Sequence, residues 1–111
     1  MEYLFSYGTL QLDRVQIQTY GRKLKGVKDE ISNFKIEQIE IFDDKILEKS
    51  KQRFHPIAIP TQNEYDYVEG VIYEITKQEL LETDAYEVSN YKRLLKRFKS
   101  GKKAWIYVFN D

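Results

Sequence analysis

Two short stretches of this 111-residue chain hold residue types that can bind a ligand or move a proton. Near the N-terminus, a largely apolar run that begins at Tyr3 stops at Gly8, and a hydroxyl residue, Thr9, follows it. A glycine at this place is typical of a turn that ends a strand. It also lets backbone N–H groups approach a ligand closely, because no Cβ stands in the way. Further along the chain, two carboxylates lie three residues apart, those of Asp84 and Glu87.

These two carboxylates fall at the end of a predicted helix, where residues three apart lie near one face. The helix dipole disfavours acids at a C-terminus, so a solvated helix end is the ordinary interpretation of such a pair. Glu87 has a further feature, because aromatic residues flank it at Tyr86 and Tyr91. A carboxylate partly buried among aromatic rings has a raised pKa, which suits a general base. We therefore take Glu87 as the candidate catalytic acid/base, Tyr86 and Tyr91 as candidate pocket-lining residues, and Asp84 as a structural residue.

Other constellations that carry catalysis are missing from the sequence. The chain has no cysteine, which excludes disulfides, thiolate zinc sites and cysteine nucleophiles. A single histidine, His55, excludes a multi-histidine metal site. The ordinary pKa of an imidazole, about 6.5, suits a base. However, His55 directly precedes Pro56 in an apolar segment with no motif around it, so we interpret it as a structural or surface residue.

Charge and composition narrow the class of protein. Lysine and arginine together number 18, as do aspartate and glutamate, so the formal net charge is zero. Because binders of nucleic acid normally show a basic excess, we expect no nucleic-acid partner. No apolar run approaches the roughly 20 residues that span a bilayer, and the N-terminus lacks a signal-peptide pattern. We expect a cytoplasmic protein with no membrane partner, folded as a single domain over residues 1–111.

The elements that must position the candidate residues can be predicted from periodicity and end signals. Thr76 and Glu79 match a capping box that begins a helix. Residues 91–98 and 104–109 predict two strands joined by a hairpin turn at 99–102, and both faces of the second strand are apolar. The other expected elements are strands at 3–7, 24–31, 34–41 and 67–75, a helix within 11–20 ended by Gly21, and a piece at 54–60 whose prolines, Pro56 and Pro60, favour an edge strand or loop. This order predicts an α+β domain with a mixed sheet covered on both faces, as in a small barrel or a sheet with helices packed on it.

Three motifs stand in order along the chain. They are Tyr7-Gly8-Thr9-Leu10 after the first strand, then Gly70-Val71-Ile72-Tyr73-Glu74-Ile75, then Asp84-Ala85-Tyr86-Glu87 with Tyr91 and Arg93 downstream. The first motif alone is weak, but the three in this order are fairly specific. Together they resemble the gamma-glutamylcyclotransferase-like family, which includes the gamma-glutamylamine cyclotransferases and many small bacterial proteins. The resemblance covers nearly the whole chain.

The resemblance implies an α+β fold, with a small mixed sheet curled into a barrel and short flanking helices. It also implies an enzyme that converts a gamma-glutamyl amine or peptide to 5-oxoproline and releases the amine. The substrate's own α-amine attacks its side-chain carbonyl, so the protein has only to orient the substrate and transfer protons. In the family, the loop matching Tyr7, Gly8, Thr9 and Leu10 holds the glutamyl portion with backbone amides, and the carboxylate matching Glu87 is the acid/base. The resemblance implies no cofactor and no metal.

The chain departs from the family pattern at three places. Thr83 and Val88 stand where a leucine and a glycine are common, and Gln11 stands where many members have a basic residue. These changes keep Glu87, but the identity of the released amine stays open. The oligomeric state stays open as well. Two other functions stay open as well. The chain can be a non-catalytic module that binds gamma-glutamyl or amino-acid-like ligands in the same pocket, or an interaction protein that uses exposed tyrosines.

Overall fold

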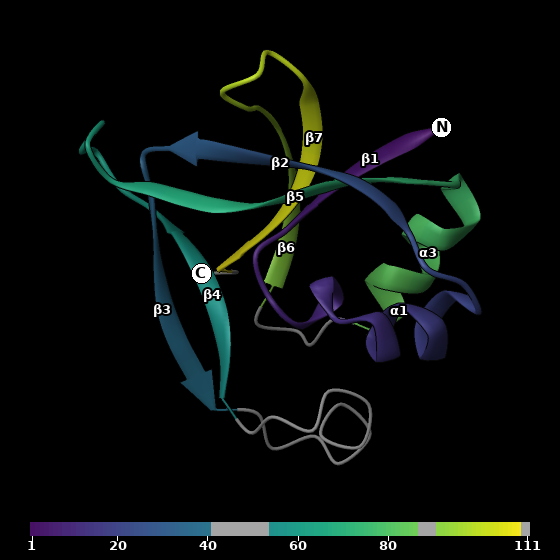
Figure 1. Ribbon diagram of the computed structural model, residues 1–111. Helices are drawn as coiled ribbons and strands as arrows, with labels where there is room; N and C mark the ends of the chain where they lie inside the picture. The colour runs from purple at the N-terminus through teal and green to yellow at the C-terminus, as the bar shows by residue number, and fades with distance from the viewer. Residues whose placement is uncertain (41–53, 87–90, 110–111) are drawn as a thin grey trace.

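The computed structural model describes residues 1–40, 54–86 and 91–109 of the chain. Strands and short helices alternate along it, and the chain ends in a β-hairpin (Figure 1). The elements are β1 (Glu2–Ser6), the 3₁₀ turn η1 (Thr9–Gln11), α1 (Asp13–Tyr20), β2 (Lys25–Ser32), β3 (Phe34–Glu40), β4 (Phe54–Pro60), β5 (Tyr67–Ile75), α3 (Lys77–Tyr86), β6 (Tyr91–Arg97) and β7 (Lys103–Phe109). This order confirms the predicted α+β class.

The strands form one seven-stranded sheet that curls into a half-barrel (Figure 1). Its order is β2-β5-β1-β7-β4-β3, and β6 pairs with the remaining edge of β7. β7 runs parallel to β1 and to β4, whereas the other pairs are antiparallel, so the sheet is mixed, as predicted. β2 and β3 stand at opposite ends of this order, yet only Asn33 separates them in the chain. The sheet therefore has to curl to bring its two ends together.

Asn33 turns the chain from β2 into β3. Its φ of 66° lies in the left-handed region, which asparagine tolerates better than most residues. Its N–H donates to the carbonyl of Asp66, and its carbonyl accepts from the N–H of Thr61, each over 2.8 Å. The corner is thus bonded in both directions to the connection between β4 and β5, which fixes the bend.

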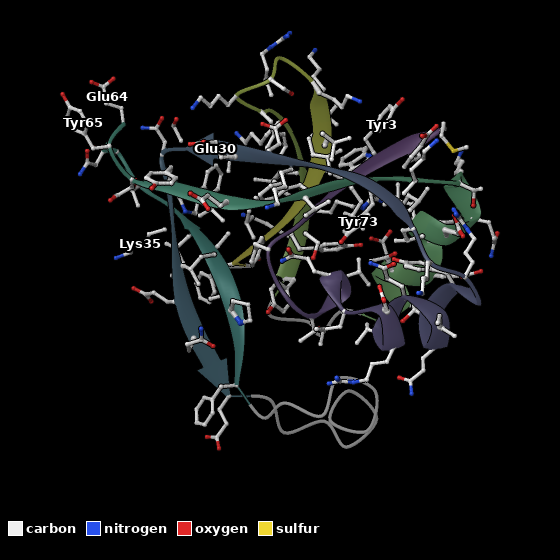
Figure 2. All side chains as sticks on the ribbon, viewed as in Figure 1. Tyr3, Glu30, Lys35, Glu64, Tyr65 and Tyr73 are labelled. Atoms are coloured by element: carbon white, nitrogen blue, oxygen red, sulfur yellow. The ribbon has the colours of Figure 1, made fainter. Side chains whose placement is uncertain are left out.

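Both faces of β7 are largely buried, as the apolar residues on its two faces predict. Ile106 and Val108 face the inside of the half-barrel, in a cluster with Phe5, Ile31, Phe34, Ala58, Val68, Ile72, Phe98 and Ala104. Trp105 and Tyr107 belong to a second cluster, which joins the outer face to Val15 of α1 and Leu80 of α3. Tyr73 of β5 also lies between the sheet and the helices (Figure 2). The helices therefore cover the outer face beside β1, β5 and β7.

The position of β4 differs from the prediction. Its two prolines favour an edge strand or a loop, but β4 lies inside the sheet, between β3 and β7. The prolines are tolerated there because β4 pairs with β7 at a single residue pair, Ala58 with Val108. Neither Pro56 nor Pro60 therefore has to donate a hydrogen bond to β7.

α3 begins at the predicted capping box. The N–H of Glu79 donates to Oγ1 of Thr76 over 3.0 Å, and the N–H of Thr76 donates back to Oε1 of Glu79 over 2.9 Å. Arg22 adds a two-point contact to the same carboxylate, at 2.8 Å from Nε and 2.7 Å from Nη2. This guanidinium contact lowers the pKa of the Glu79 carboxyl, although burial acts in the opposite direction, and the Thr76 amide adds to the lowering.

Replacing Asn33 tests the corner. Asn33→Ala should lower the free energy of unfolding by about 1 kcal/mol, because an ordinary residue in the left-handed region costs about 1–2 kcal/mol. Asn33→Gly is the matched control, since it has no Cβ and should leave the stability nearly unchanged. Urea unfolding followed by the fluorescence of Trp105 measures both. Equal losses in the two variants would show that the backbone conformation is not the cause.

The lowered pKa of Glu79 predicts a pH-dependent contribution to stability. A carboxyl whose pKa is depressed in the folded state stabilises the fold above its unfolded pKa, which is about 4.3 for glutamate, and loses that contribution as the pH falls through the folded value. The difference in unfolding free energy between the wild type and Glu79→Gln should therefore be largest near neutral pH and shrink below about pH 4. Urea titrations across this range measure it. A difference that stays constant would contradict the ionic origin.

Candidate functional site

One edge of β7 is shared by two parallel strands. β1 pairs with residues 105–106 of β7, and β4 takes over at Val108. At this changeover, the hydroxyl of Tyr7 donates to the carbonyl of Tyr107 and accepts from the N–H of Ala58, the latter over 3.1 Å. The hydroxyl therefore bridges β7 and β4 at the point where β1 ends and its chain turns away.

This bridge gives the side chain of Tyr7 a structural role. Its hydroxyl both donates and accepts within the sheet, and so bonds to one backbone carbonyl and one backbone N–H at the point where β1 ends. Sequence analysis names Tyr7 as a substrate-binding residue. A ligand contact at this position would come from its backbone or the edge of its ring.

After β1 the chain makes a tight loop at Gly8 and enters η1. The φ of Gly8 is −134°, so a left-handed backbone is not the reason for the glycine. A Cβ at this position would lie 3.1 Å from Cγ of Pro56, which is closer than ordinary van der Waals contact. Gly8 therefore suits the close approach of β4 to this loop, because a Cβ would force the loop or the proline ring to shift by a few tenths of an ångström.

A buried glutamine holds the far end of the loop. Nε2 of Gln16 donates to the carbonyl of Leu10 over 2.8 Å, and Oε1 accepts from the N–H of Leu24, also over 2.8 Å. Gln16 is 2% exposed although it is a polar residue of a short helix. Sequence analysis did not single it out, because a glutamine in a helical pattern normally marks the solvent face.

The first backbone N–H groups of η1 can donate to a ligand. Within the described residues, the structure shows no acceptor for the N–H groups of Thr9 and Leu10. The preceding N–H, that of Gly8, reaches Oγ of Ser6 only over a long 3.4 Å. The first N–H groups of a helical turn have no partner within the turn, and successive donors of this kind can hold a carboxylate or an oxyanion.

The loop and its neighbours surround a cavity of about 40 Å³, which has room for a water-sized group. Its lining consists of Leu4, Phe5, Ser6, Tyr7, Gly8, Thr9, Leu10, Pro56, Tyr91 and Tyr107. The hydroxyl of Tyr91 donates to the carbonyl of Pro56 over 2.7 Å and so joins β6 to β4. Five residues named from the sequence, Tyr7 to Leu10 and Tyr91, thus come together although 80 residues lie between the two groups.

The side chains of two other residues named from the sequence lie outside the described part of the structure. Tyr86 is the last residue of α3, and Glu87 lies outside the described residues. Their assignment as pocket-lining residue and acid/base stays a prediction. Conversely, sequence analysis did not name Pro56 or Tyr107 as cavity residues. Tyr107 gave no signal, because an aromatic residue in an alternating strand is the ordinary pattern of a core.

Asp84 lies at the C-terminal end of α3, where the sequence assigns it a structural role. Both of its oxygens accept from Arg93, over 2.9 Å from Nε and 2.9 Å from Nη2. Oδ1 also accepts from the hydroxyl of Tyr107 over 2.5 Å. The cation of Arg93 explains how a carboxylate is tolerated at the negative end of the helix dipole.

A second and wider depression, of about 750 Å³, lies over β2, β5 and the turn between β6 and β7. Several of its polar groups contact one another. Lys99 pairs with Glu30 over 3.3 Å, and the hydroxyl of Ser100 donates to the carboxylate of Asp29. Burial alone would raise the pKa of Asp29, but the hydrogen bonds from Ser100 and from the amide of Glu30 lower it on balance. These contacts stabilise the turn against β2, and none of the candidate residues from the sequence lies here.

The described parts of the chain contain no group of three or more histidine, aspartate or glutamate residues arranged to hold a metal ion. No helix in these parts is long and apolar enough to cross a membrane.

Comparison with known proteins gives one family and several similar structures. The chain matches the family described as gamma-glutamyl cyclotransferase, AIG2-like, over residues 4–111. A solved structure described as a gamma-glutamyl cyclotransferase superposes with a TM-score of 0.74 at 15% identity, over 99% of this chain and 67% of that one. An uncharacterized protein from Pyrococcus horikoshii gives 0.69 at 18% identity, over 100% and 80% of the two chains. A protein from Arabidopsis thaliana gives 0.73 at 20% identity, over 99% and 69%.

No curated protein matches the chain closely in sequence. At identities of 20% or less, the similar structures show the fold alone. The family match is broader evidence, because it spans nearly the whole chain and includes the loop and the cavity residues described above. The chain therefore belongs to the gamma-glutamyl cyclotransferase, AIG2-like family.

Proposed function

We propose that the chain is a gamma-glutamylcyclotransferase-type enzyme, which cyclises a gamma-glutamyl amine or peptide to 5-oxoproline and releases the amine. The observation that carries the proposal is the cavity at the loop after β1. The open N–H groups of Thr9 and Leu10 belong to residues that line it, and Gly8 keeps the loop free of a side chain. Donors of this kind suit the α-carboxylate of a glutamyl group or the carbonyl oxygen that gains charge during the reaction.

This reaction needs orientation and proton transfer rather than a protein nucleophile. The α-nitrogen of the glutamyl group forms a bond to its side-chain carbonyl carbon, and the bond from that carbon to the leaving nitrogen breaks. One proton leaves the α-ammonium and one reaches the departing nitrogen, so a single carboxylate can carry out both transfers. The protein has to hold the glutamyl group in the curled conformation in which these two atoms meet, which is a task of orientation.

We assign the proton transfers to Glu87. It is the residue after the end of α3, and Asp84, three positions earlier, is bonded to the cavity residue Tyr107. The chain that carries Glu87 therefore departs from a point bonded to the wall of the cavity. This anchoring, together with the family to which the chain belongs, supports the assignment.

One observation favours a second candidate, a non-catalytic module that binds gamma-glutamyl or amino-acid-like ligands. Among the described residues that line the cavity, none is a carboxylate or a histidine. The hydroxyls of Tyr7 and Tyr91 donate to backbone carbonyls. The described cavity thus offers backbone donors for binding, and its chemistry depends on Glu87.

Incubation with a panel of gamma-glutamyl amines, gamma-glutamyl dipeptides and glutathione, with an assay for 5-oxoproline, separates the two candidates. Formation of 5-oxoproline from any of them supports the enzyme. Binding of these compounds without turnover would support the binding module.

Glu87→Gln should lower turnover by about a hundredfold or more, because it keeps the shape of the side chain and removes its proton transfer. Glu82→Gln is the matched control on α3 and should leave turnover near the wild-type value. Initial rates of 5-oxoproline formation measure both, and circular dichroism checks that the variants are folded. Near-native turnover in Glu87→Gln would refute the assignment of the acid/base.

Gly8→Ala should weaken the binding of 5-oxoproline by about tenfold while changing the free energy of unfolding by less than about 1 kcal/mol. The new Cβ would lie 3.1 Å from Cγ of Pro56, so the loop or the proline ring has to shift by a few tenths of an ångström. Isothermal titration calorimetry measures the affinity and urea unfolding the stability. Unchanged affinity in a folded Gly8→Val variant would show that this backbone does not contact the ligand.

A further inference from the structure

The end of α3 is joined to the cavity wall through one carboxylate. Asp84 accepts two hydrogen bonds from Arg93 and one from Tyr107, which accounts for both of its oxygens. The side chains of Asp84 and Arg93 are 34% and 23% exposed, so the pair is partly shielded from water. A two-point contact of this kind fixes orientation as well as distance.

The ion pair between Asp84 and Arg93 also joins the two elements on either side of a short connection, α3 and β6. α3 ends at Tyr86 and β6 begins at Tyr91, so four residues connect them. Asp84 lies two residues before the first of these ends, and Arg93 lies two residues after the second. The contact between Asp84 and Arg93 therefore fixes the two ends of the connection that contains Glu87 relative to each other.

Tyr107 extends this contact to the loop after β1. Its hydroxyl donates to Asp84, whereas its carbonyl accepts from the hydroxyl of Tyr7. Tyr107 also lines the cavity. One residue of β7 therefore links the end of α3 to the loop that carries Gly8.

The guanidinium of Arg93 also contacts the ring of Trp105. Its guanidinium lies 4.2 Å from the ring centroid of Trp105, and Nε1 of Trp105 donates to Glu2 over 3.0 Å. Stacking of a guanidinium on an indole restricts its orientation. The contact with Trp105 therefore helps to orient the guanidinium of Arg93 toward Asp84.

α3 provides an internal comparison, because a second two-point pair, Arg22 with Glu79, lies at its N-terminal end. The distances of 2.7 and 2.8 Å are similar to those of the first pair. The described contacts of this second pair include the Thr76 cap, and neither of its members lines the cavity. One pair can therefore serve as the control for the other.

We propose that Asp84, Arg93 and Tyr107 form a positioning network, which holds the end of α3 and the start of β6, on either side of the connection that contains Glu87, in register with the loop that carries Gly8. The proposal rests on the proposed function for its effect on turnover. None of the three residues transfers a proton or touches a reacting atom. They act through Glu87 and the loop, so their loss should lower kcat more than it raises KM.

The test compares Tyr107→Phe and Arg93→Met with Arg22→Met, using the gamma-glutamyl substrate that the wild type turns over. Tyr107→Phe removes one hydroxyl and keeps the ring and the carbonyl that accepts from Tyr7. Both network variants should lower kcat by about tenfold with KM within about twofold of the wild type, because a small misplacement is costly in an oriented reaction. Arg22→Met should lower the melting temperature with kcat unchanged. Equal kcat values in all three variants would overturn the proposal.

A second readout does not depend on turnover. The chain has five glycines, so protein labelled with ¹⁵N-glycine gives five amide signals. Tyr107→Phe and Arg93→Met should shift the signal of Gly8, whereas Arg22→Met should shift that of the neighbouring Gly21 and leave Gly8 in place. If the wild type turns over no substrate, the proposed function fails. The Gly8 signal then tests the positioning network by itself. A Gly8 signal that stays in place in both network variants would overturn the positioning network.

Discussion

The hydroxyl of Tyr7 lies on the edge of β7 at the point where pairing with β1 ends and pairing with β4 begins. Two parallel strands, β1 and β4, use that edge in turn, and between them the hydroxyl of Tyr7 bonds to the carbonyl of Tyr107 and to the N–H of Ala58. A hydrogen bond of this kind contributes about 0.5–1.5 kcal/mol to stability. One side chain therefore joins β7 to β4. The position of the loop, the path of β4 and the cavity between them all follow from this junction.

The same junction explains why the local sequence looks irregular. β4 can carry prolines inside a sheet only because it pairs with β7 at one residue pair. Pro56 packs against the loop, and a glycine opposite it avoids a tight contact, because a Cβ would lie 3.1 Å from Cγ of the proline ring. Gly8 and Pro56 are therefore complementary in shape. The cavity is the remaining volume where the sheet is least regular.

Local structure could be predicted from the sequence more fully than the arrangement of the strands. The strand at 67–75, the capping box of α3 and the C-terminal hairpin follow from patterns a few residues long, and the structure has them where these patterns predict. The inner position of β4 and the role of Tyr7 depend on which strands meet, and periodicity carries no information on sheet order. Two prolines disfavour a strand that is hydrogen-bonded on both sides. β4 nevertheless lies inside the sheet, because it pairs with β7 at only one residue pair. The buried Gln16 was missed for a similar reason, since its partners are a loop carbonyl and a distant amide.

Two features of the sequence break local rules, and the structure brings both to the region of Gly8. A proline interrupts an inner strand, and Asp84 stands at the unfavourable end of a helix. Gly8 and Pro56 line the cavity, and Asp84 bonds to Tyr107, which lines it as well. The cost of each exception is reduced by its setting: the proline lies where β4 has a single residue pair with β7 and it faces a glycine, and the acid meets Arg93. Residues that contradict their local setting and find compensation at a distance tend to collect where a fold is shaped for function rather than for stability alone. For this chain, that reasoning selects the same loop and helix end as the family resemblance does, although it starts from different observations.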